Sequence, residues 1–383
     1  MPDESTPARA AATTFAWVPS DALHVIPGDQ PCTAALVADV LAARGGIAVI
    51  LGTDAETARV RSLGSTLQAR VEGAACPVVR EPVLAARSLR RSIGTRAAPR
   101  EIVAWGLDAA VTARVAWPAR SVTAVLLDGG ASPCSEWLAR RGPRWRPHAV
   151  RAIGADVAAR FAGLSPTPID VFGPVGVDPS RLHSDRRAIR RRWGARPDEC
   201  VVGLLGEPAD RVDARRIAQL VGIAAVRGER VRLVVHPAAC RREATERWLA
   251  GIDIPNFLIV DESIARPWDV VAGLDVASFG ADAAIAAGRL GFGSRLAGLG
   301  CLFRARPGPV SPLPALWARA AGVPIVAERG ALVDALARDL TAADVTLWDD
   351  EDAVRATRQI VAVARTLGAD RSADAPTLCA TPL

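Results

Sequence analysis

The chain has 383 residues, of which half are apolar and 23% are charged. This length exceeds what one hydrophobic core of ordinary size holds and predicts two domains, and the composition excludes an intrinsically disordered chain. The net charge of +6 comes from arginine alone, because the sequence contains no lysine.

Three features of the sequence bear on the protein's location. It contains no run of about 18 or more uncharged apolar residues, which a transmembrane helix requires. Residues 1–14 begin with acids and lack the basic start and apolar run of a secretion signal. The seven cysteines are widely spaced and form no Cys-x-x-Cys pair, which predicts reduced thiols. We therefore expect a cytoplasmic protein with a disordered tail at 1–14 and a flexible tail at 369–383.

The basic residues are distributed among acids rather than gathered into a stripe with aromatic residues, so the sequence predicts no nucleic-acid binding. Two local arginine clusters, at residues 87–91 and 190–192, leave an anionic partner or a peripheral membrane association open. The histidines and cysteines show no metal-ligand spacing. We expect neither a metal nor a cofactor.

In the first half of the chain, short apolar runs alternate with segments of helical periodicity, which is typical of a parallel sheet covered by helices. The predicted strands are Gly46–Gly52, Cys76–Val79, Glu101–Gly106, Ser121–Leu127 and Ile169–Phe172. The predicted helices are Ala34–Arg44, Ala55–Arg70, Val83–Ile93 and Ala109–Val115. Several strands end in glycine or aspartate, among them those ending at Gly106 and before Asp128, and open α/β sheets bind ligands at such ends.

A Gly/Pro-rich segment, Gly173–Pro179, separates this half from a second half with the same alternation. The predicted strands there are Val201–Leu205, Val231–Val235, Phe257–Val260, Asp275–Phe279, Pro324–Ala327 and Val345–Trp348. The predicted helices are Val212–Arg227, Arg241–Ala250, Pro312–Ala321, Ala331–Leu340 and Glu351–Leu367. The sequence thus predicts an α/β protein with two Rossmann-like domains, residues 15–173 and 174–368, and a ligand cleft between them.

Three passages carry a resemblance to a known family. Residues 27–49 combine a Gly-containing turn, a helix and the run Gly-Gly-Ile-Ala-Val. Residues 176–206 combine Gly176-Val177-Asp178, the run Arg190-Arg191-Arg192-Trp193-Gly194 and a predicted strand that ends at Gly206. Residues 318–327 read Ala-Arg-Ala-Ala-Gly-Val-Pro-Ile-Val-Ala. In this order they resemble the opening, the passage into the second domain and the "E-A-M-A-x-G-V-P-V-V-A" motif of the large group of retaining GT-B glycosyltransferases that use nucleotide sugars.

The resemblance implies a GT-B architecture, in which the C-terminal domain binds a nucleotide sugar and the N-terminal domain binds an acceptor that the sequence does not identify. Gly28 and Gly206 lie at predicted strand-to-helix turns, where backbone N–H groups can approach a phosphate. Arg211, Arg215 and His236 are the side chains that we expect to contact a diphosphate. A second interpretation of His236 is that it simply ends its strand.

The chain departs from the family at three positions. Trp317 and Pro309 stand where the family has two carboxylates that hold the donor, and Glu207 stands where it has a phosphate-binding arginine. Trp317 could stack on a base or a sugar as part of the binding site, or it could fill the core beneath its helix. His24, near the end of a first strand, is a further candidate for contact with a ligand.

The sequence therefore predicts a glycosyltransferase that moves a sugar from a nucleotide-sugar donor to an acceptor, with no catalytic residue identified. Because both family carboxylates are missing, an alternative is a catalytically inactive GT-B-like protein that acts as a binding or scaffolding partner. A third hypothesis is another GT-B enzyme, such as a sugar-nucleotide epimerase.

Overall fold

The computed structural model describes most of the predicted elements. The described residues are 15–28, 30–62, 67–76, 81–93, 100–127, 131–172, 185–204, 214–235, 257–261, 267–279, 313–328, 345–348, 357–358 and 361–362. Both predicted tails lie outside them, and so do the predicted helices 241–250 and 331–340.

Seven parallel strands form the first sheet. They are β1 (Leu23–Pro27), β2 (Ile47–Gly52), β3 (Val71–Ala75), β4 (Glu101–Trp105), β5 (Ser121–Leu126), β6 (Ala149–Ile153) and β7 (Asp170–Phe172). Their order is β3-β2-β1-β4-β5-β6-β7, with every pair parallel. Strands β1, β2 and β3 thus follow one another in one direction along the sheet, and β4 then pairs with the opposite side of β1.

Helices connect these strands. They are α2 (Pro31–Arg44), α3 (Asp54–Arg61), α4 (Pro82–Ile93), α5 (Leu107–Ala116), α6 (Pro133–Arg141) and α7 (Ala155–Phe161), with short 3₁₀ turns η2 (Pro143–Trp145) and η3 (Ala162–Leu164). Because the chain reverses direction along the sheet, right-handed crossovers put α2 and α3 on one face and α4, α5 and α6 on the other. Helix α5 lies between α4 and α6 and contacts three strands, which explains why almost all of its side chains are buried.

Six parallel strands form the second sheet, in the order β10-β9-β8-β11-β12-β13. They are β8 (Cys200–Leu204), β9 (Val231–Val235), β10 (Leu258–Val260), β11 (Val276–Phe279), β12 (Ile325–Glu328) and β13 (Val345–Trp348). The described helices of this part are α9 (Arg186–Arg192), α10 (Ala214–Val226) and α14 (Leu313–Ala320), with short turns η4 (Pro267–Asp269) and η5 (Val271–Gly273).

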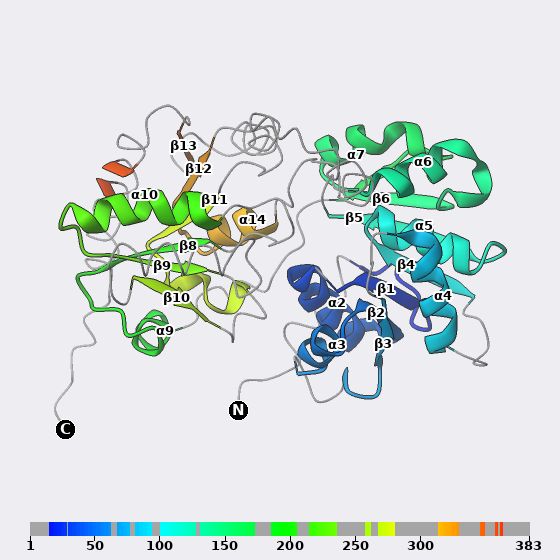
Figure 1. The fold of residues 1–383 in the computed structure, drawn as a ribbon, viewed down its shortest axis with the longest axis horizontal. Coiled ribbons are helices and arrows are strands. Elements are labelled where there is room, and N and C mark those ends of the chain that lie inside the picture. Colours follow the sequence, from blue (N-terminus) through cyan, green and yellow to red (C-terminus); the bar gives the residue numbers. More distant parts are fainter. Residues whose placement is uncertain are drawn as a thin grey trace, which may run out of the picture.

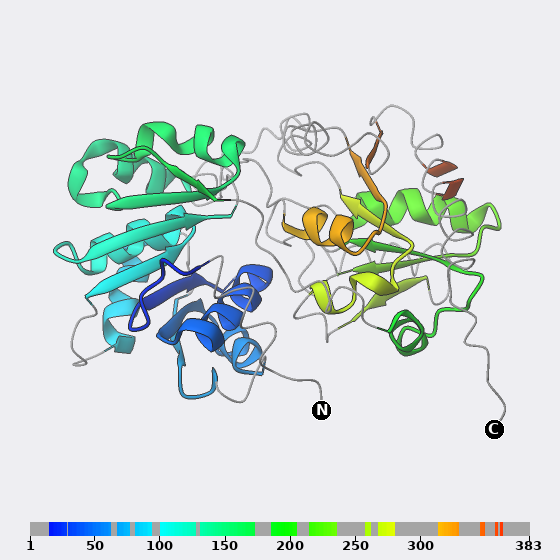
Figure 2. The same ribbon diagram turned by 180° about the vertical axis from the view of Figure 1, so that it is seen from behind.

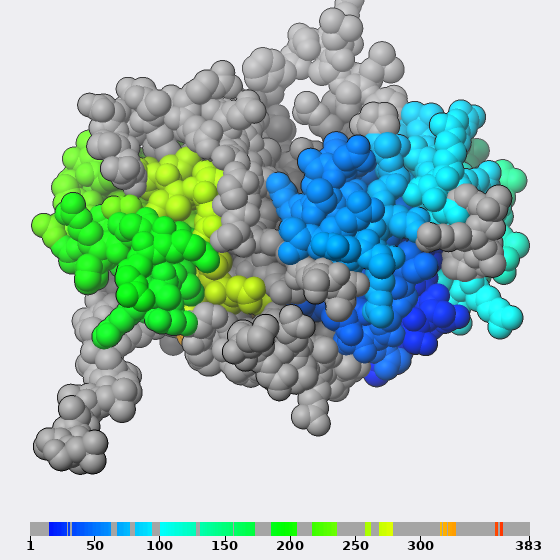
Figure 3. All heavy atoms as spheres, turned by 90° about the horizontal axis from the view of Figure 1, so that it is seen from below, coloured from blue at the N-terminus to red at the C-terminus, as the bar shows by residue number. Residues whose placement is uncertain are grey.

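The two sheets belong to two separate bodies. Figure 1 shows β1–β7 with their helices on one side and β8–β13 with α10 on the other, and Figure 2 shows the same division from behind. In the space-filling view of Figure 3, the blue and cyan residues of the first body and the green and yellow residues of the second occupy opposite halves of the face shown. Among the described residues, no strand of one sheet pairs with the other.

The predicted fold class is confirmed: the protein is α/β, with two parallel Rossmann-like sheets. The domain boundary between residues 173 and 174 falls in a stretch outside the described residues and stays a prediction. Thr357 and Val361 represent the predicted closing helix; the Thr357 hydroxyl donates to the Leu220 carbonyl of α10 at 2.8 Å, and Val361 packs in the core of the second sheet.

The sequence prediction omits α6, β6 and α7, and it is also wrong in the region between β2 and α4. The predicted helix 55–70 ends already at Arg61, and a strand that was not predicted follows at Val71–Ala75. Of the predicted strand Cys76–Val79, only Cys76 is among the described residues, and it lies just outside β3. Strand β3 is at the edge of its sheet and reads Val-Glu-Gly-Ala-Ala, with two residues fully buried. Such an edge strand carries a weaker apolar signal than the run that follows it, which explains why it was not predicted.

Candidate functional site

The first sheet changes direction between β1 and β4, which are hydrogen-bonded neighbours. In an open α/β sheet, the loops at the carboxyl ends of two such strands diverge to opposite faces and leave a crevice for a ligand. Gly28 follows β1 and Gly106 follows β4. These two turns therefore define the candidate site of the first body.

Gly28 lies at a strand-to-helix turn, as we expected. The structure shows that close packing accounts for the glycine at this position. Its N–H donates to the Leu51 carbonyl at 2.8 Å. A Cβ at this position would lie 2.6 Å from Glu56 Oε2 and 3.0 Å from the Leu51 oxygen. Glu56 is itself fixed, because its carboxylate accepts hydrogen bonds from the Thr53 N–H at 2.6 Å and the Thr53 hydroxyl at 3.0 Å.

Gly106 has the properties that a ligand-approach turn requires. Its φ of 99° favours glycine, and no atom lies within 4 Å of where a Cβ would stand. It is the N-cap of α5, and no side chain caps that helix start, so the start of the helix offers backbone N–H groups to a ligand. The sequence carried this signal in the Trp-Gly pair that ends a predicted strand.

A polar link continues from this turn toward α6. Asp108, in the first turn of α5, accepts hydrogen bonds from the Ser132 N–H at 2.9 Å and from the Ser132 hydroxyl at 2.7 Å. Ser132 is in turn the N-cap of α6 and accepts from the Ser135 N–H at 3.2 Å. Sequence reasoning did not find Asp108 or Ser132, because the two are 24 residues apart and belong to no motif.

The second sheet changes direction between β8 and β11. Strands β8 and β9 end side by side, with Leu204 opposite Val235. The predicted ligand residues Gly206, Arg211 and His236 follow these two ends and lie outside the described residues. Arg215 is the second residue of α10. As phosphate contacts, these four residues stay predictions.

Trp317 fills the core, one of the two roles that the sequence left open for it. It is 2% exposed and makes an edge-to-face contact with Trp268, with ring centroids 4.6 Å apart. Its helix α14 ends at Ala320, and a turn through Gly322, whose φ is 64°, leads to β12 at Ile325. The Ala-Gly-Val-Pro run of the family-like passage is thus a helix-to-strand turn.

His24 is a core residue rather than a ligand contact. It lies in β1 with 0% of its surface exposed, and its Nδ1 accepts a hydrogen bond from the Trp105 indole at 3.2 Å. Burial lowers the pKa of His24 to about 4, so the imidazole is neutral near pH 7. His24 cannot reach a ligand at the carboxyl end of the sheet.

The arginine cluster at 190–192 has largely structural partners. Arg190 donates to Asp275 at 2.7 Å and to the carbonyls of residues 196 and 199, and Arg192 donates to Asp261 at 2.6 Å. Trp193 donates to the same carboxylate oxygen at 2.7 Å. These contacts hold α9 against the second sheet, which accounts for most of this cluster without an anionic partner.

Within the described residues, no helix is long and apolar enough to cross a membrane. No group of three or more His, Cys, Asp or Glu side chains in that same part of the chain is arranged to hold a metal ion.

The two sheets, each with its own change of direction, define the GT-B fold, and comparison with solved structures confirms it. The chain is similar to the crystal structure of WaaG, a glycosyltransferase involved in lipopolysaccharide biosynthesis, with a TM-score of 0.53 and 13% identity over 91% of each chain. It is also similar to sucrose-phosphate synthase from Thermosynechococcus elongatus, with a TM-score of 0.54 and 12% identity over 91% of this chain and 92% of that one. No protein-family model matches the chain, and no curated protein matches its sequence.

Proposed function

We propose that this protein transfers a sugar from a nucleotide-sugar donor to an acceptor. The observation that carries the proposal is the GT-B fold itself, which both solved glycosyltransferase-type neighbours share over nine-tenths of their length. Fold alone supports only the class of reaction, and the residues at the two carboxyl edges have to supply its chemistry.

In this proposal the donor binds at the carboxyl edge of the second sheet. Arg215 and the sequence-predicted Gly206, Arg211 and His236 hold its diphosphate, and backbone N–H groups supplement the arginine charge. The acceptor binds at the crevice of the first sheet, beside Gly106. Catalysis then comes from orienting the two substrates and from stabilising the departing diphosphate.

A specific observation favours the alternative of an inactive, binding GT-B-like protein. Trp317 occupies the position of one family carboxylate and is buried against Trp268, so it offers no acceptor to a ribose hydroxyl. A charge-assisted hydrogen bond to a hydroxyl is worth about 1.5–3 kcal/mol, and its loss weakens a nucleotide by about one to two decades.

Calorimetry with uridine, guanosine and adenosine diphosphate sugars separates the two possibilities. For a transferase we expect weak binding of one nucleotide class together with slow donor hydrolysis. The Arg215→Gln variant should reduce both, because Arg215 lies in the first turn of α10. The matched control is Arg227→Gln, which removes an exposed arginine just past the other end of the same helix and should change neither.

Two results would contradict the proposal. Absence of binding to every donor, with the protein folded, would favour the inactive partner. Binding that responds equally to the Arg215 and Arg227 variants would remove Arg215 from the site.

A further inference from the structure

Helices α4 and α6 present an outward surface of unusual composition. On α6 the residues that face away from the sheet are Trp137, Arg140 and Arg141. Its one acid, Glu136, is buried and pairs with Arg160 and, at 3.8 Å, with Arg140. Helix α4 itself contains no acid, although Glu81 just before it accepts the Leu84 N–H, and the exposed residues of the helix are Val83, Leu84, Arg87, Arg90 and Arg91. With Arg144 and Trp145 of η2, these residues form what we call the α4–α6 face.

The apolar side chains of this face are exposed well beyond what packing requires. Trp137 is 54% exposed, Leu84 46% and Val83 43%, although large apolar side chains are ordinarily drawn into the core. No described neighbour covers them. Their exposure is a cost in water unless a partner takes up the apolar surface.

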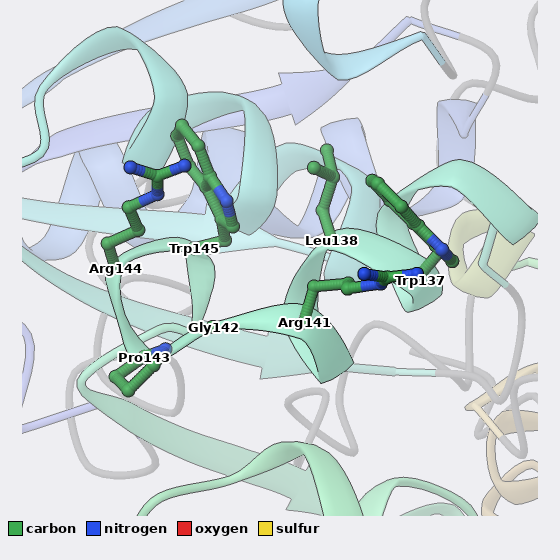
Figure 4. A pocket seen from close by; sticks show the side chains of 7 residues that line it. All are labelled: Trp137, Leu138, Arg141, Gly142, Pro143, Arg144 and Trp145. Atoms are coloured by element: carbon green, nitrogen blue, oxygen red, sulfur yellow. The ribbon is translucent and has the colours of Figure 1, made fainter.

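Two of the arginines lie directly over indole rings. The guanidinium of Arg141 is 5.0 Å from the ring centroid of Trp137, and that of Arg144 is 4.5 Å from the ring centroid of Trp145. Figure 4 shows these two pairs on either side of Leu138, where they line an open pocket of about 650 Å³. Each pair brings a cation and an amphipathic ring to the same depth at the surface.

This combination fits one chemical environment in particular. Indole rings settle at the headgroup level of a lipid bilayer, with the ring in an apolar layer and the N–H in water. Guanidinium groups form bidentate contacts with phosphates, and aliphatic side chains such as Val83 and Leu84 enter the upper acyl region. Single-stranded nucleic acid also combines phosphates with stacking bases, but it has no use for exposed aliphatic side chains.

We propose that the α4–α6 face binds the surface of an anionic phospholipid bilayer. Trp137 inserts at headgroup depth beside the partly buried Trp145, Val83 and Leu84 contact the acyl chains, and the arginines contact lipid phosphates. Helix α5, held between α4 and α6, fixes the spacing of the two contact lines. This association is independent of the catalytic proposal, because it uses the outer helical layer and not the carboxyl edges of the sheets.

The test is co-sedimentation of the full chain with vesicles of phosphatidylcholine alone and of an equal mixture of phosphatidylcholine and phosphatidylglycerol. We expect binding to the mixed vesicles that weakens as salt is added. The double variant Arg141→Gln/Arg144→Gln should weaken the partition coefficient about 25-fold, since a basic residue at such a surface contributes about fivefold. Trp137→Ala should weaken it about tenfold.

The matched control is Arg187→Gln/Arg191→Gln, which removes the same charge from the exposed side of α9 and should change binding less than about twofold. All the substituted side chains are exposed, and circular dichroism checks that each variant is folded. Equal loss in both double variants would show a response to net charge alone and overturn the proposal. Equal binding to both vesicle types, or capture by oligothymidine and not by vesicles, would overturn it as well.

Discussion

At the scale of single residues, the central strand β1 contains a titratable group sealed inside the protein. His24 is buried, accepts a hydrogen bond from Trp105 at Nδ1, and has no partner for its Nε2. Gly46 lies against the ring, since a Cβ there would stand 3.4 Å from His24 Nε2. A proton added to His24 would place a charge with no counter-ion in a low-dielectric core.

This burial predicts a loss of stability in mild acid. The pKa of His24 falls from 6.5 to about 4 on folding, so the unfolded chain binds this proton more readily between those pH values. Stability is complete above pH 6.5 and declines by about 3 kcal/mol as the pH falls toward 4. Urea unfolding at several pH values measures the decline. His24→Gln should remove most of this loss of stability at low pH. His148→Gln, which replaces an exposed histidine, should leave most of the loss in place.

Asp275 predicts a larger effect from a single substitution. It pairs with Arg186 and Arg190 and accepts the Val201 N–H at 2.7 Å. Both the Asp275 and the Arg190 side chains are 9% exposed. Asp275→Ala leaves a buried arginine unpaired and should cost about 3–5 kcal/mol, measured by thermal unfolding. Asp198→Ala breaks the exposed pair with Arg230 and should cost less than about 1 kcal/mol; similar costs for the two would disprove the argument.

Sequence reasoning reached some of these residues and missed others for a physical reason. The core role of Trp317 could be weighed in advance, because a large apolar residue on a short helix usually packs inward. The role of Arg190 could not, since its partner Asp275 is 85 residues away. The partners of His24 and Asp108 are likewise distant in the sequence. The periodicity of apolar residues indicates which side of a helix or strand is buried, but not which residues contact that side.

At the scale of elements, the length and burial of a strand determined whether its bounds could be predicted from the sequence. Buried central strands such as β9 were predicted with their observed bounds, whereas the short edge strand β3 was not predicted. Strand β6, Ala-Val-Arg-Ala-Ile, was missed because two alanines and an arginine leave it only two residues that favour strands. The loops at the carboxyl ends of the second sheet follow no period, so the chemistry placed there by resemblance stays a prediction.

The turn after β1 offers a test of packing at this scale. Gly28→Ala should destabilise the protein, because its Cβ would press on Glu56 and on the Leu51 carbonyl. In a Glu56→Ala background, Gly28→Ala should lower the free energy of unfolding by less, since only the contact with the Leu51 carbonyl remains. A double-mutant cycle of unfolding free energies measures the difference. Equal costs in the two backgrounds would show that Glu56 is not what requires the glycine.

At the scale of the whole molecule, the two sheets should respond to damage separately. Asp275 lies within the second body, and no described strand of the first sheet pairs with it. Hydrogen exchange of the Asp275→Ala variant should therefore rise in peptides from β8 to β12 and stay unchanged in β1 to β6. Gly28→Ala should give the reverse pattern. A rise throughout the chain in both variants would mean that the two bodies unfold as one unit.

The order of strands in the first sheet also matters while the chain is being made. Strand β1 pairs with β2 soon after synthesis, but its other neighbour, β4, begins only at Glu101. At about 5–20 residues per second, the ribosome leaves that apolar edge open for several seconds. Once β7 is complete at Phe172, every described strand of the first sheet has its pairing neighbours. Nascent chains stalled before β4 should therefore recruit holdase chaperones, and chains stalled beyond β7 should not.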